Sequence, residues 1–229
     1  MIITSAYTDN PLVKYTTPNK EEYCDRYDYV CEMQQHDYKM VDWERDHGKS
    51  YGFFRIKHLL DLCNEYMDGE WIMWMDCDTL IMNHNTDICQ FLDNNYDMII
   101  GEDWNGINTG VFFVRISERI KRFLTEVLAF TPTALTQAQY PDWWTVSEQC
   151  AIYHLHQTIK TKVVHHSLFN GYPFGPYDSN DWRHAGLGPI NPNWKPQQFQ
   201  VGDFVLHLAS GNMDFKLCYL QQYLPAVIK

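Results

Sequence analysis

The sequence lacks the long apolar run that a membrane-spanning helix needs. No stretch of its 229 residues comes near the roughly 18 consecutive apolar residues of such a span, and the N-terminus, MIITSAYTDN, has neither the basic nor the apolar region of a signal peptide. Internal repeats and low-complexity linkers are absent as well. These absences predict a soluble, cytoplasmic protein with no membrane segment, folded as one α/β domain over residues 1–229.

Basic residues and paired cysteines are also scarce. The chain has 18 Lys and Arg against 29 Asp and Glu, a net charge of −11, which argues against nucleic acid and anionic membrane as partners. The seven cysteines form no C-x-x-C pair and fall mostly in apolar stretches, which indicates reduced, structural thiols. An anionic ligand would therefore have to be received by a metal ion and a few placed cations.

What the chain does have is an alternation of short apolar strands and amphipathic helices. The first strand is expected at residues 1–8. The further elements are expected at 19–28 (helix), 29–31 (strand), 51–67 (helix), 72–75, 96–103 and 107–117 (strands), 118–130 and 147–157 (helices), 161–169 and 203–210 (strands) and 215–224 (helix). This order predicts a mostly parallel, mixed central sheet flanked by helices, with ligands bound at the carboxyl ends of its strands.

The stretch EWIMWMDCDTLIMN, residues 70–83, carries an apolar strand directly into two aspartates. Residues 72–75 are apolar on both faces, as in a central strand covered on both sides. Asp76 and Asp78 lie two residues apart, so in an extended chain their carboxylates project to the same side, where they repel unless a positive charge lies between them. The alternative is that both residues simply open a loop.

Residues 171–196 are dense in Gly, Pro and aromatics and have no periodicity. A segment of this kind predicts a lid-like functional loop, because its aromatic content argues against disorder. Its aromatic faces suit sugar rings, although packing of the loop onto its own domain is an alternative role. The aromatics concerned are Tyr172, Phe174, Tyr177, Trp182 and Trp194.

Four segments, in this order and at these spacings, resemble a known enzyme family: WIMWMDCDTLIM, INTGVFFVRIS, SEQCAIYHL and DFVLHLAS. They are similar to nucleotide-sugar glycosyltransferases of the GT-A (Rossmann-like) fold, and in particular to the galactosyl-, mannosyl- and xylosyltransferases of glycosyltransferase family 34. The resemblance spans roughly residues 1–215. The compact chain is more similar to soluble members encoded by large algal viruses or microbes than to Golgi enzymes, which would place a viral member in the host cytoplasm.

The resemblance implies a metal-dependent transferase. Such an enzyme moves a hexose-type sugar from a UDP- or GDP-sugar to a hydroxyl of a glycan or glycoprotein acceptor, and most family members retain the anomeric configuration. Residues 1–110 would hold the nucleotide sugar and the metal, and residues 111–229 would form the acceptor side with the lid-like loop. The nucleotide, the sugar, the acceptor and the oligomeric state stay open.

The resemblance also assigns a metal site. Asp76 and Asp78 match the D-x-D motif, which in the family holds a divalent ion, usually Mn²⁺ and otherwise Mg²⁺, against the donor diphosphate. His207 matches the late histidine that completes the metal shell. Carboxylates and imidazole suit manganese, and a divalent ion offsets the charge of a diphosphate leaving group. As an alternative, His207 is a hydrogen-bonded histidine of the core.

Further donor contacts follow from the same match. Asn108, Thr109 and Gly110 match the NTG segment beside the sugar. Arg55 falls where the family has a lysine that faces the diphosphate, with Lys57 as the alternative two residues later.

The first strand and the late motif supply the remaining donor assignments. The first strand, Thr4, Ser5, Ala6 and Tyr7, would contact the nucleotide, because first strands of such sheets end at the base and ribose. Cys77 is the spacer of the D-x-D motif; as a metal ligand its thiolate would select zinc. Gly211 and Lys216 would contact phosphate, although the late motif reads HLASG instead of the common H-F-x-G form.

The catalytic assignments are Glu148, Gln149 and Asp103. Glu148 and Gln149 match an acidic-Gln pair next to the reacting sugar, with Glu where Asp is more usual. Glu148 could instead be an acid in the first turn of its helix, where it favours the helix dipole. Asp103, together with Trp104, would orient the acceptor hydroxyl, and Asp103 or Glu148 would be the base if the enzyme inverts.

Two other classes of protein fit part of the pattern. Phosphohydrolases of the haloacid dehalogenase type carry D-x-D-x-T, but here Thr79 directly follows Asp78 and the motif does not lie in the first strand. A non-catalytic carbohydrate-binding module could be built on the same fold, because a fold does not fix an activity. The intact set of Asp76, Asp78 and His207 speaks against such a degenerate protein.

Overall fold

The computed structural model describes residues 1–36, 42, 48–103, 106–139, 142–173, 198–209 and 212–229. A central sheet has the strand order β2-β1-β3-β6-β5-β7. Its strands are β1 (Ile2–Tyr7), β2 (Val30–Gln35), β3 (Trp71–Met75), β5 (Met98–Asp103), β6 (Gly106–Arg115) and β7 (Thr161–His165). β1 pairs in parallel with β2 and β3, and β5 with β7, whereas β6 runs antiparallel between β3 and β5. The mainly parallel, mixed sheet expected from the sequence is confirmed.

A second, two-stranded antiparallel sheet joins β4 (Thr79–Ile81) to β8 (Val205–His207). The sequence patterns predicted a strand at 203–210 but did not reveal β4, which starts only one residue after Asp78. Its three residues are fully buried, and the backbone N–H of Thr79 donates to the carbonyl of Asp76 at 3.1 Å. The turn between the aspartates therefore leads the chain out of the central sheet and into the small one.

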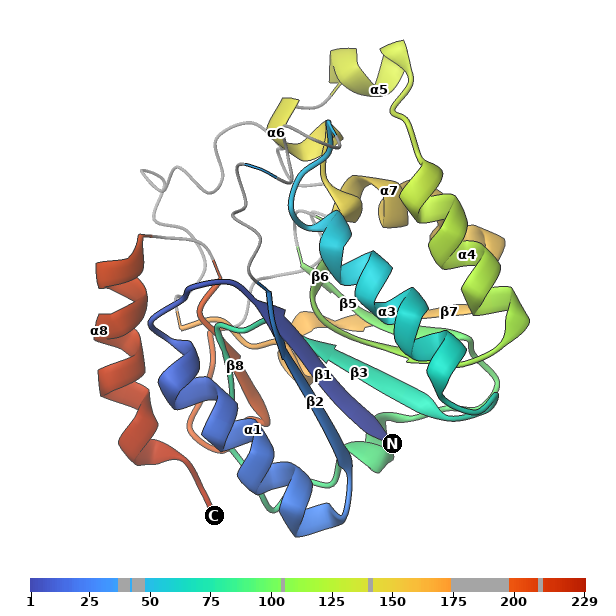
Figure 1. Cartoon of the computed structure of the whole chain (residues 1–229). Helices are drawn as coiled ribbons and strands as arrows, with labels where there is room; N and C mark the ends of the chain where they lie inside the picture. Colours follow the sequence, from blue (N-terminus) through green and yellow to red (C-terminus); the bar gives the residue numbers. More distant parts are fainter. Residues whose placement is uncertain (37–41, 43–47, 104–105, 140–141, 174–197, 210–211) are drawn as a thin grey trace.

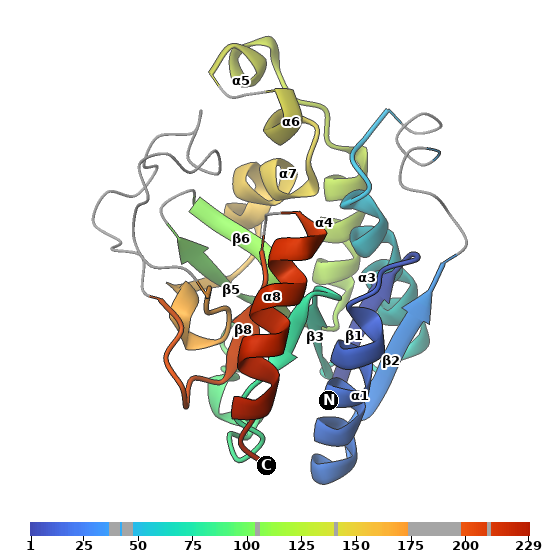
Figure 2. The same cartoon turned by 90° about the vertical axis from the view of Figure 1, so that its left-hand side faces the viewer.

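Helices cover both faces of the central sheet (Figure 1). One face packs against α3 (Phe53–Glu65), α4 (Glu118–Ala129) and α7 (Glu148–Leu155). The other face packs against α1 (Val13–Tyr27) and the small sheet. The terminal helix α8 (Met213–Tyr223) lies on the outer side of the small sheet (Figure 2). Two short helices, α5 (Ala134–Gln139) and α6 (Asp142–Thr145), connect α4 to α7.

The sequence explains these layers. Ile72 and Trp74 of β3 face the core shared with α3 and α4, and Met73 and Met75 face the other core, so the strand that reads apolar throughout is buried on both sides. Ser117 and Ser147 start α4 and α7, because each side-chain oxygen accepts the backbone N–H three residues later. The helices predicted from residues 118 and 147 are confirmed.

The described residues contain no helix long and apolar enough to cross a bilayer. Within the lid-like loop expected at 171–196, residues from 174 onward lie outside the described part. The division into a donor half and an acceptor half stays a prediction.

Candidate active site

The aspartate pair follows the carboxyl end of β3, as the sequence pattern predicted, but the chain there is not extended as expected, because Cys77 and Asp78 form a turn. The backbone N–H of Asp76 donates to the carbonyl of Gly110 at 2.8 Å, which ties the end of β3 to the first part of β6. Cys77 turns away from the pair: its Sγ accepts from Asn10 Nδ2 at 3.3 Å and its carbonyl from Thr16 Oγ1 at 2.6 Å. Both carboxylates consequently face one space, with the thiol on the side of α1.

His207 meets this pair because β8 pairs with β4. His207 lies opposite Thr79 in that ladder, and Leu208 N–H donates to the carbonyl of Asp78 at 3.0 Å. The Nε2 atom of His207 lies 3.4 Å from Asp78 Oδ1 and 3.8 Å from Asp76 Oδ2. One ligand atom from each of the three residues falls within 4.8 Å of the other two, so the structure brings together the three predicted metal ligands.

Gly110 makes room for this imidazole. A Cβ atom at position 110 would lie 2.1 Å from His207 Cε1 and 2.6 Å from its Nδ1. No side chain can occupy that position while the ring stays in place. The glycine of the NTG segment is therefore required by the approach of His207, a reason that the sequence alone did not supply.

Each carboxylate of the pair also has a cation. Arg55 Nη1 lies 3.0 Å from Asp76 Oδ1, and Lys216 Nζ lies 2.5 Å from Asp78 Oδ2. Burial opposes ionisation of Asp78, but the imidazolium form of His207 and the Lys216 ammonium together hold the pKa of Asp78 well below its usual range. Burial, with the neighbouring Asp78 charge, raises the pKa of Asp76 in spite of Arg55. Asp78 is thus the stronger acid of the pair.

Arg55 connects the pair to Glu148. Arg55 Nε lies 3.4 Å from Glu148 Oε1, and its Nη1 donates to the carbonyl of Thr109 at 2.6 Å. Thr109 Oγ1 in turn donates to Glu148 Oε1 at 2.8 Å. Lys57, the alternative to Arg55, is half exposed and pairs with Asp61 at 2.6 Å. The structure therefore places Arg55, and not Lys57, in the site.

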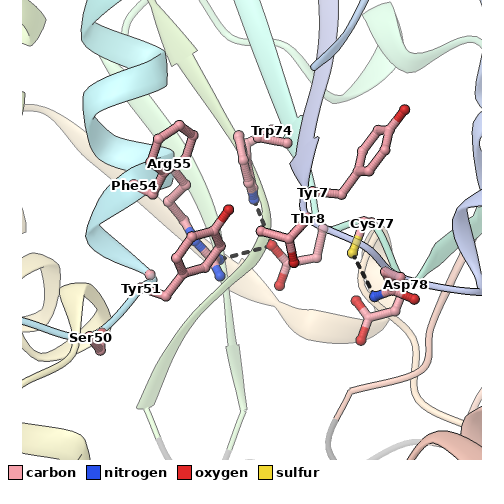
Figure 3. A pocket seen from close by; sticks show the side chains of 13 residues that line it. Tyr7, Thr8, Ser50, Tyr51, Phe54, Arg55, Trp74, Cys77 and Asp78 are labelled. Atoms are coloured by element: carbon pink, nitrogen blue, oxygen red, sulfur yellow. Dashed lines mark hydrogen bonds and ion pairs between the residues drawn. The ribbon is translucent and has the colours of Figure 1, made fainter. Parts of the chain in front are cut away.

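Two cavities meet at the aspartate pair. One, of about 290 Å³, is lined by Ala6, Tyr7, Tyr51, Trp74 and Cys77 among others (Figure 3). The second, of about 320 Å³, is lined by Asn108, Thr109, Gly110, Glu148, Gln149, His207 and Lys216 among others. Arg55, Asp76 and Asp78 line both cavities. Charged groups therefore form the boundary between an aromatic compartment and a polar one.

Comparison with known proteins identifies the family of this chain. The model of the galactosyl transferase GMA12/MNN10 family matches residues 3–96 and 91–216. The chain belongs to this family. A curated alpha-1,2-galactosyltransferase of Schizosaccharomyces pombe is 25% identical over 244 residues, which cover 91% of this chain and 58% of that protein. The chain thus spans less than two thirds of this curated relative.

Solved structures share the fold of this family member. A glycosyltransferase involved in the glycosylation of the major capsid of PBCV-1 superposes with a TM-score of 0.67 at 17% identity, over 96% of this chain and 98% of that one. The galactosyltransferase LgtC, solved with donor and acceptor sugar analogs, gives 0.55 at 13% identity, over 99% and 95%. The GT-A fold expected from the four sequence segments is confirmed.

Some predicted site residues lie elsewhere. Thr4 and Ser5 are buried and are not among the described residues that line the two cavities; Thr4 Oγ1 donates to the carbonyl of Glu32 at 2.8 Å. Asp103 is missing from the described residues that line the two cavities; its Oδ2 accepts from Tyr172 Oη at 2.7 Å. Trp104 and Gly211 lie outside the described residues.

Two residues of the site had no signal in the sequence. Lys20 of α1 is buried under the aspartate turn, where its Nζ donates to the carbonyl of Thr79 at 2.9 Å. Burial lowers the pKa of Lys20 to about 8, and the nearby Cys77, Asp78 and Asp76 oppose that shift. Asn170 is fully buried beside His207. Neither residue belongs to a motif, and only the fold brings Lys20 to the aspartate turn and Asn170 to His207.

Proposed function

We propose that the chain is a metal-dependent glycosyltransferase that moves a hexose-type sugar from a nucleoside-diphosphate sugar to a hydroxyl of a glycan acceptor. The observation that carries this proposal is the cluster of Asp76, Asp78 and His207 at the boundary between two cavities. A nucleotide sugar has the same division, with an aromatic base and a polar sugar on either side of a diphosphate. Family membership points to the same class of reaction.

The chemistry of the cluster fits a divalent ion. The ligand atoms of two carboxylates and one imidazole lie within 4.8 Å of one another. This mixed set of oxygen and nitrogen donors suits Mn²⁺, whereas Mg²⁺ prefers oxygen ligands alone. Burial and the two neighbouring carboxylates raise the pKa of Cys77 to about 12, and its Sγ accepts a hydrogen bond from Asn10 Nδ2 at 3.3 Å. When bound, the metal would offset negative charge on the departing diphosphate.

The chain's own residues divide the remaining work. We assign the nucleoside to the cavity of Tyr7, Tyr51 and Trp74, where aromatic faces are available for a base. Arg55 and Lys216, which in this arrangement face Asp76 and Asp78, are the cations within reach of a diphosphate at the boundary.

The sugar would lie in the polar cavity. Asn108, Glu148 and Gln149 line it and offer amide and carboxylate groups to sugar hydroxyls. Arg55 and the Thr109 hydroxyl hold the Glu148 carboxylate in place. We include retention of the anomeric configuration in the proposal, on the resemblance to the family, and the anomer of the product measured by NMR would test it.

The first donor to test is UDP-galactose, because the curated relatives are alpha-1,2-galactosyltransferases. Release of the nucleoside diphosphate would be measured over a panel of UDP- and GDP-sugars, with Mn²⁺, with EDTA, and with Mn²⁺ restored, each with and without simple glycan acceptors. The proposal expects release from one donor that EDTA abolishes and Mn²⁺ restores. Release that is unchanged in EDTA would contradict the metal assignment.

A matched pair of variants sharpens this test. Asp78→Asn removes a buried member of the cluster, whereas Asp61→Asn removes an exposed aspartate of α3 that pairs with Lys57 and is not in the cluster. We expect turnover to be lost in Asp78→Asn and kept in Asp61→Asn, with both variants folded by circular dichroism. Phosphate release from a simple phosphomonoester would favour the phosphohydrolase instead. Chelator-independent glycan binding without donor turnover would favour the binding module.

A further inference from the structure

Asn170 links the NTG segment to the histidine of the metal cluster. Its Nδ2 donates to Asn108 Oδ1 at 2.8 Å, and its Oδ1 lies 2.8 Å from His207 Nδ1. Asn170 is fully buried, and the backbone N–H of Asn170 donates to the carbonyl of His166 at 2.7 Å. The next residue is bonded to β8: the Gly171 carbonyl accepts the His207 N–H at 2.7 Å. Asn170 and His207 are therefore held together by backbone and side chain.

The backbone N–H of Gly110 determines the direction of every hydrogen bond in the series from Gly110 through Asn108 and Asn170 to His207. The backbone N–H of Gly110 is a donor, so the atom that it meets at 2.9 Å must be the carbonyl oxygen of the Asn108 side chain. That oxygen can only accept, so Asn170 presents its NH₂ group to it. The remaining atom of the Asn170 amide is its carbonyl oxygen, and this oxygen faces His207.

The consequence is a defined tautomer of His207. Because an amide oxygen only accepts, His207 Nδ1 must carry the hydrogen, and in the neutral ring Nε2 then holds the lone pair. Nε2 is the nitrogen that faces Asp78 and Asp76. Two carboxylates on their own would draw the hydrogen to Nε2, where it would block a metal. The amide of Asn170 opposes that preference.

We infer that Asn170 is a positioning residue, which keeps the hydrogen on His207 Nδ1 and so presents the Nε2 lone pair to a divalent ion. This inference rests on the proposed metal site but concerns a residue that hydrogen-bonds one of its ligands, His207, and is not itself a ligand. Partners that orient a ligating histidine typically change metal affinity by about 10- to 100-fold when they are removed.

The test reads the tautomer directly. In metal-free protein, ¹⁵N shifts of the imidazole distinguish the Nδ1–H tautomer, the Nε2–H tautomer and the imidazolium from one another, and His207→Gln assigns the signal. We expect Nδ1–H in the wild type and predominantly Nε2–H in Asn170→Ala. Binding of Mn²⁺ alone, measured by calorimetry or electron paramagnetic resonance, should weaken by about 10- to 100-fold in Asn170→Ala.

Two control variants separate this role from a structural one. Asn170→Asp keeps an oxygen toward Nδ1 but gives up the NH₂ group that binds Asn108, so we expect the wild-type tautomer and a Mn²⁺ affinity within a few-fold of the wild type. Tyr172→Phe removes a hydrogen bond to Asp103, whose Oδ2 lies 3.5 Å from Asn108 Nδ2, and should leave both readouts unchanged. If Asn170→Ala kept the Nδ1–H tautomer, or if the Ala and Asp variants lost Mn²⁺ equally, the inference would be overturned.

The two proposals can fail separately. If the wild type does not bind Mn²⁺ at all, the proposed metal function fails, while the tautomer measurement still decides the role of Asn170. If Mn²⁺-dependent turnover is present and Asn170→Ala leaves the tautomer unchanged, the function stands and the inference about Asn170 fails.

Discussion

Gly52 and Glu148 provide a sharp quantitative test of the site. Gly52 precedes α3 with φ −55° and ψ −28°, a conformation that any residue adopts. A Cβ atom there would lie 1.7 Å from Glu148 Oε2 and 2.4 Å from its Cδ. The carboxylate of Glu148 therefore occupies the volume that a side chain at position 52 would need, and Gly52→Ala must displace it.

Two opposing contributions decide whether Gly52→Ala raises or lowers the free energy of unfolding. A glycine-to-alanine change at a permitted conformation stabilises a protein by about 0.4–1 kcal/mol, mainly through the unfolded chain. Displacement of Glu148 gives up its bond from Thr109 and its contact with Arg55. A hydrogen bond to a charged group contributes about 1.5–3 kcal/mol, so Gly52→Ala should lower the free energy of unfolding by about 1–2 kcal/mol.

The same change should reverse sign when Glu148 is truncated. In a Glu148→Ala background nothing remains to be displaced, and Gly52→Ala should stabilise the protein by about 0.4–1 kcal/mol. Urea unfolding of the four proteins measures the difference as a coupling energy of about 2 kcal/mol. A destabilisation of equal size in both backgrounds would refute the steric argument. Donor turnover should also fall in Gly52→Ala, since Glu148 is present but misplaced.

Three further predictions concern the metal site, pH and the choice of cation. Gly110→Ala places a Cβ 2.1 Å from His207 Cε1 and should weaken Mn²⁺ binding at least about tenfold by calorimetry; undiminished affinity would contradict the contact. Burial lowers the pKa of His58 from 6.5 to about 4, so the unfolded state binds more protons in that window and stability falls as pH drops through it. The loss reaches at most about 3 kcal/mol and should shrink in His58→Gln, as measured by urea unfolding at pH 7 and pH 4.5. Arg55→Ala should abolish donor turnover and Lys57→Ala should not, and the reverse result would move the diphosphate contact to Lys57.

Most helices and strands could be predicted from the sequence, because the residues that signal each of them are close together along the chain. The strand before Asp76 is apolar on both faces, and Ser117 and Ser147 cap the helices that they precede. Each of these features depends on residues within a few positions of one another. The joint placement of Asp76 and Asp78 at the end of a strand was also predicted, but the extended chain assumed for it was wrong, because Cys77 and Asp78 form a turn that the Thr79 N–H closes onto the carbonyl of Asp76.

Contacts between distant segments could not be predicted in this way. Thr4 and Ser5 belong to a first strand, as expected, but only its last residues reach the cavity, and the number that do depends on how far β1 extends past its neighbours. Asn170 follows a predicted strand and has no capping or motif signal. Its role is visible only once His207 and Asn108 are placed on either side of it.

The direction of two strands explains why the site forms where it does. In an all-parallel sheet, the first residues of a strand lie at the edge opposite the carboxyl ends, so the NTG segment at the start of β6 would be far from the aspartates. Because β6 runs antiparallel to β3, Met75 pairs with Val111, and Gly110 reaches the backbone of Asp76. β8 in the same way runs against β4, which places the end of one opposite the start of the other, His207 opposite Thr79. The antiparallel direction of β6 and β8 therefore brings the NTG segment and His207 to the carboxylates at the end of β3, which no single motif could do.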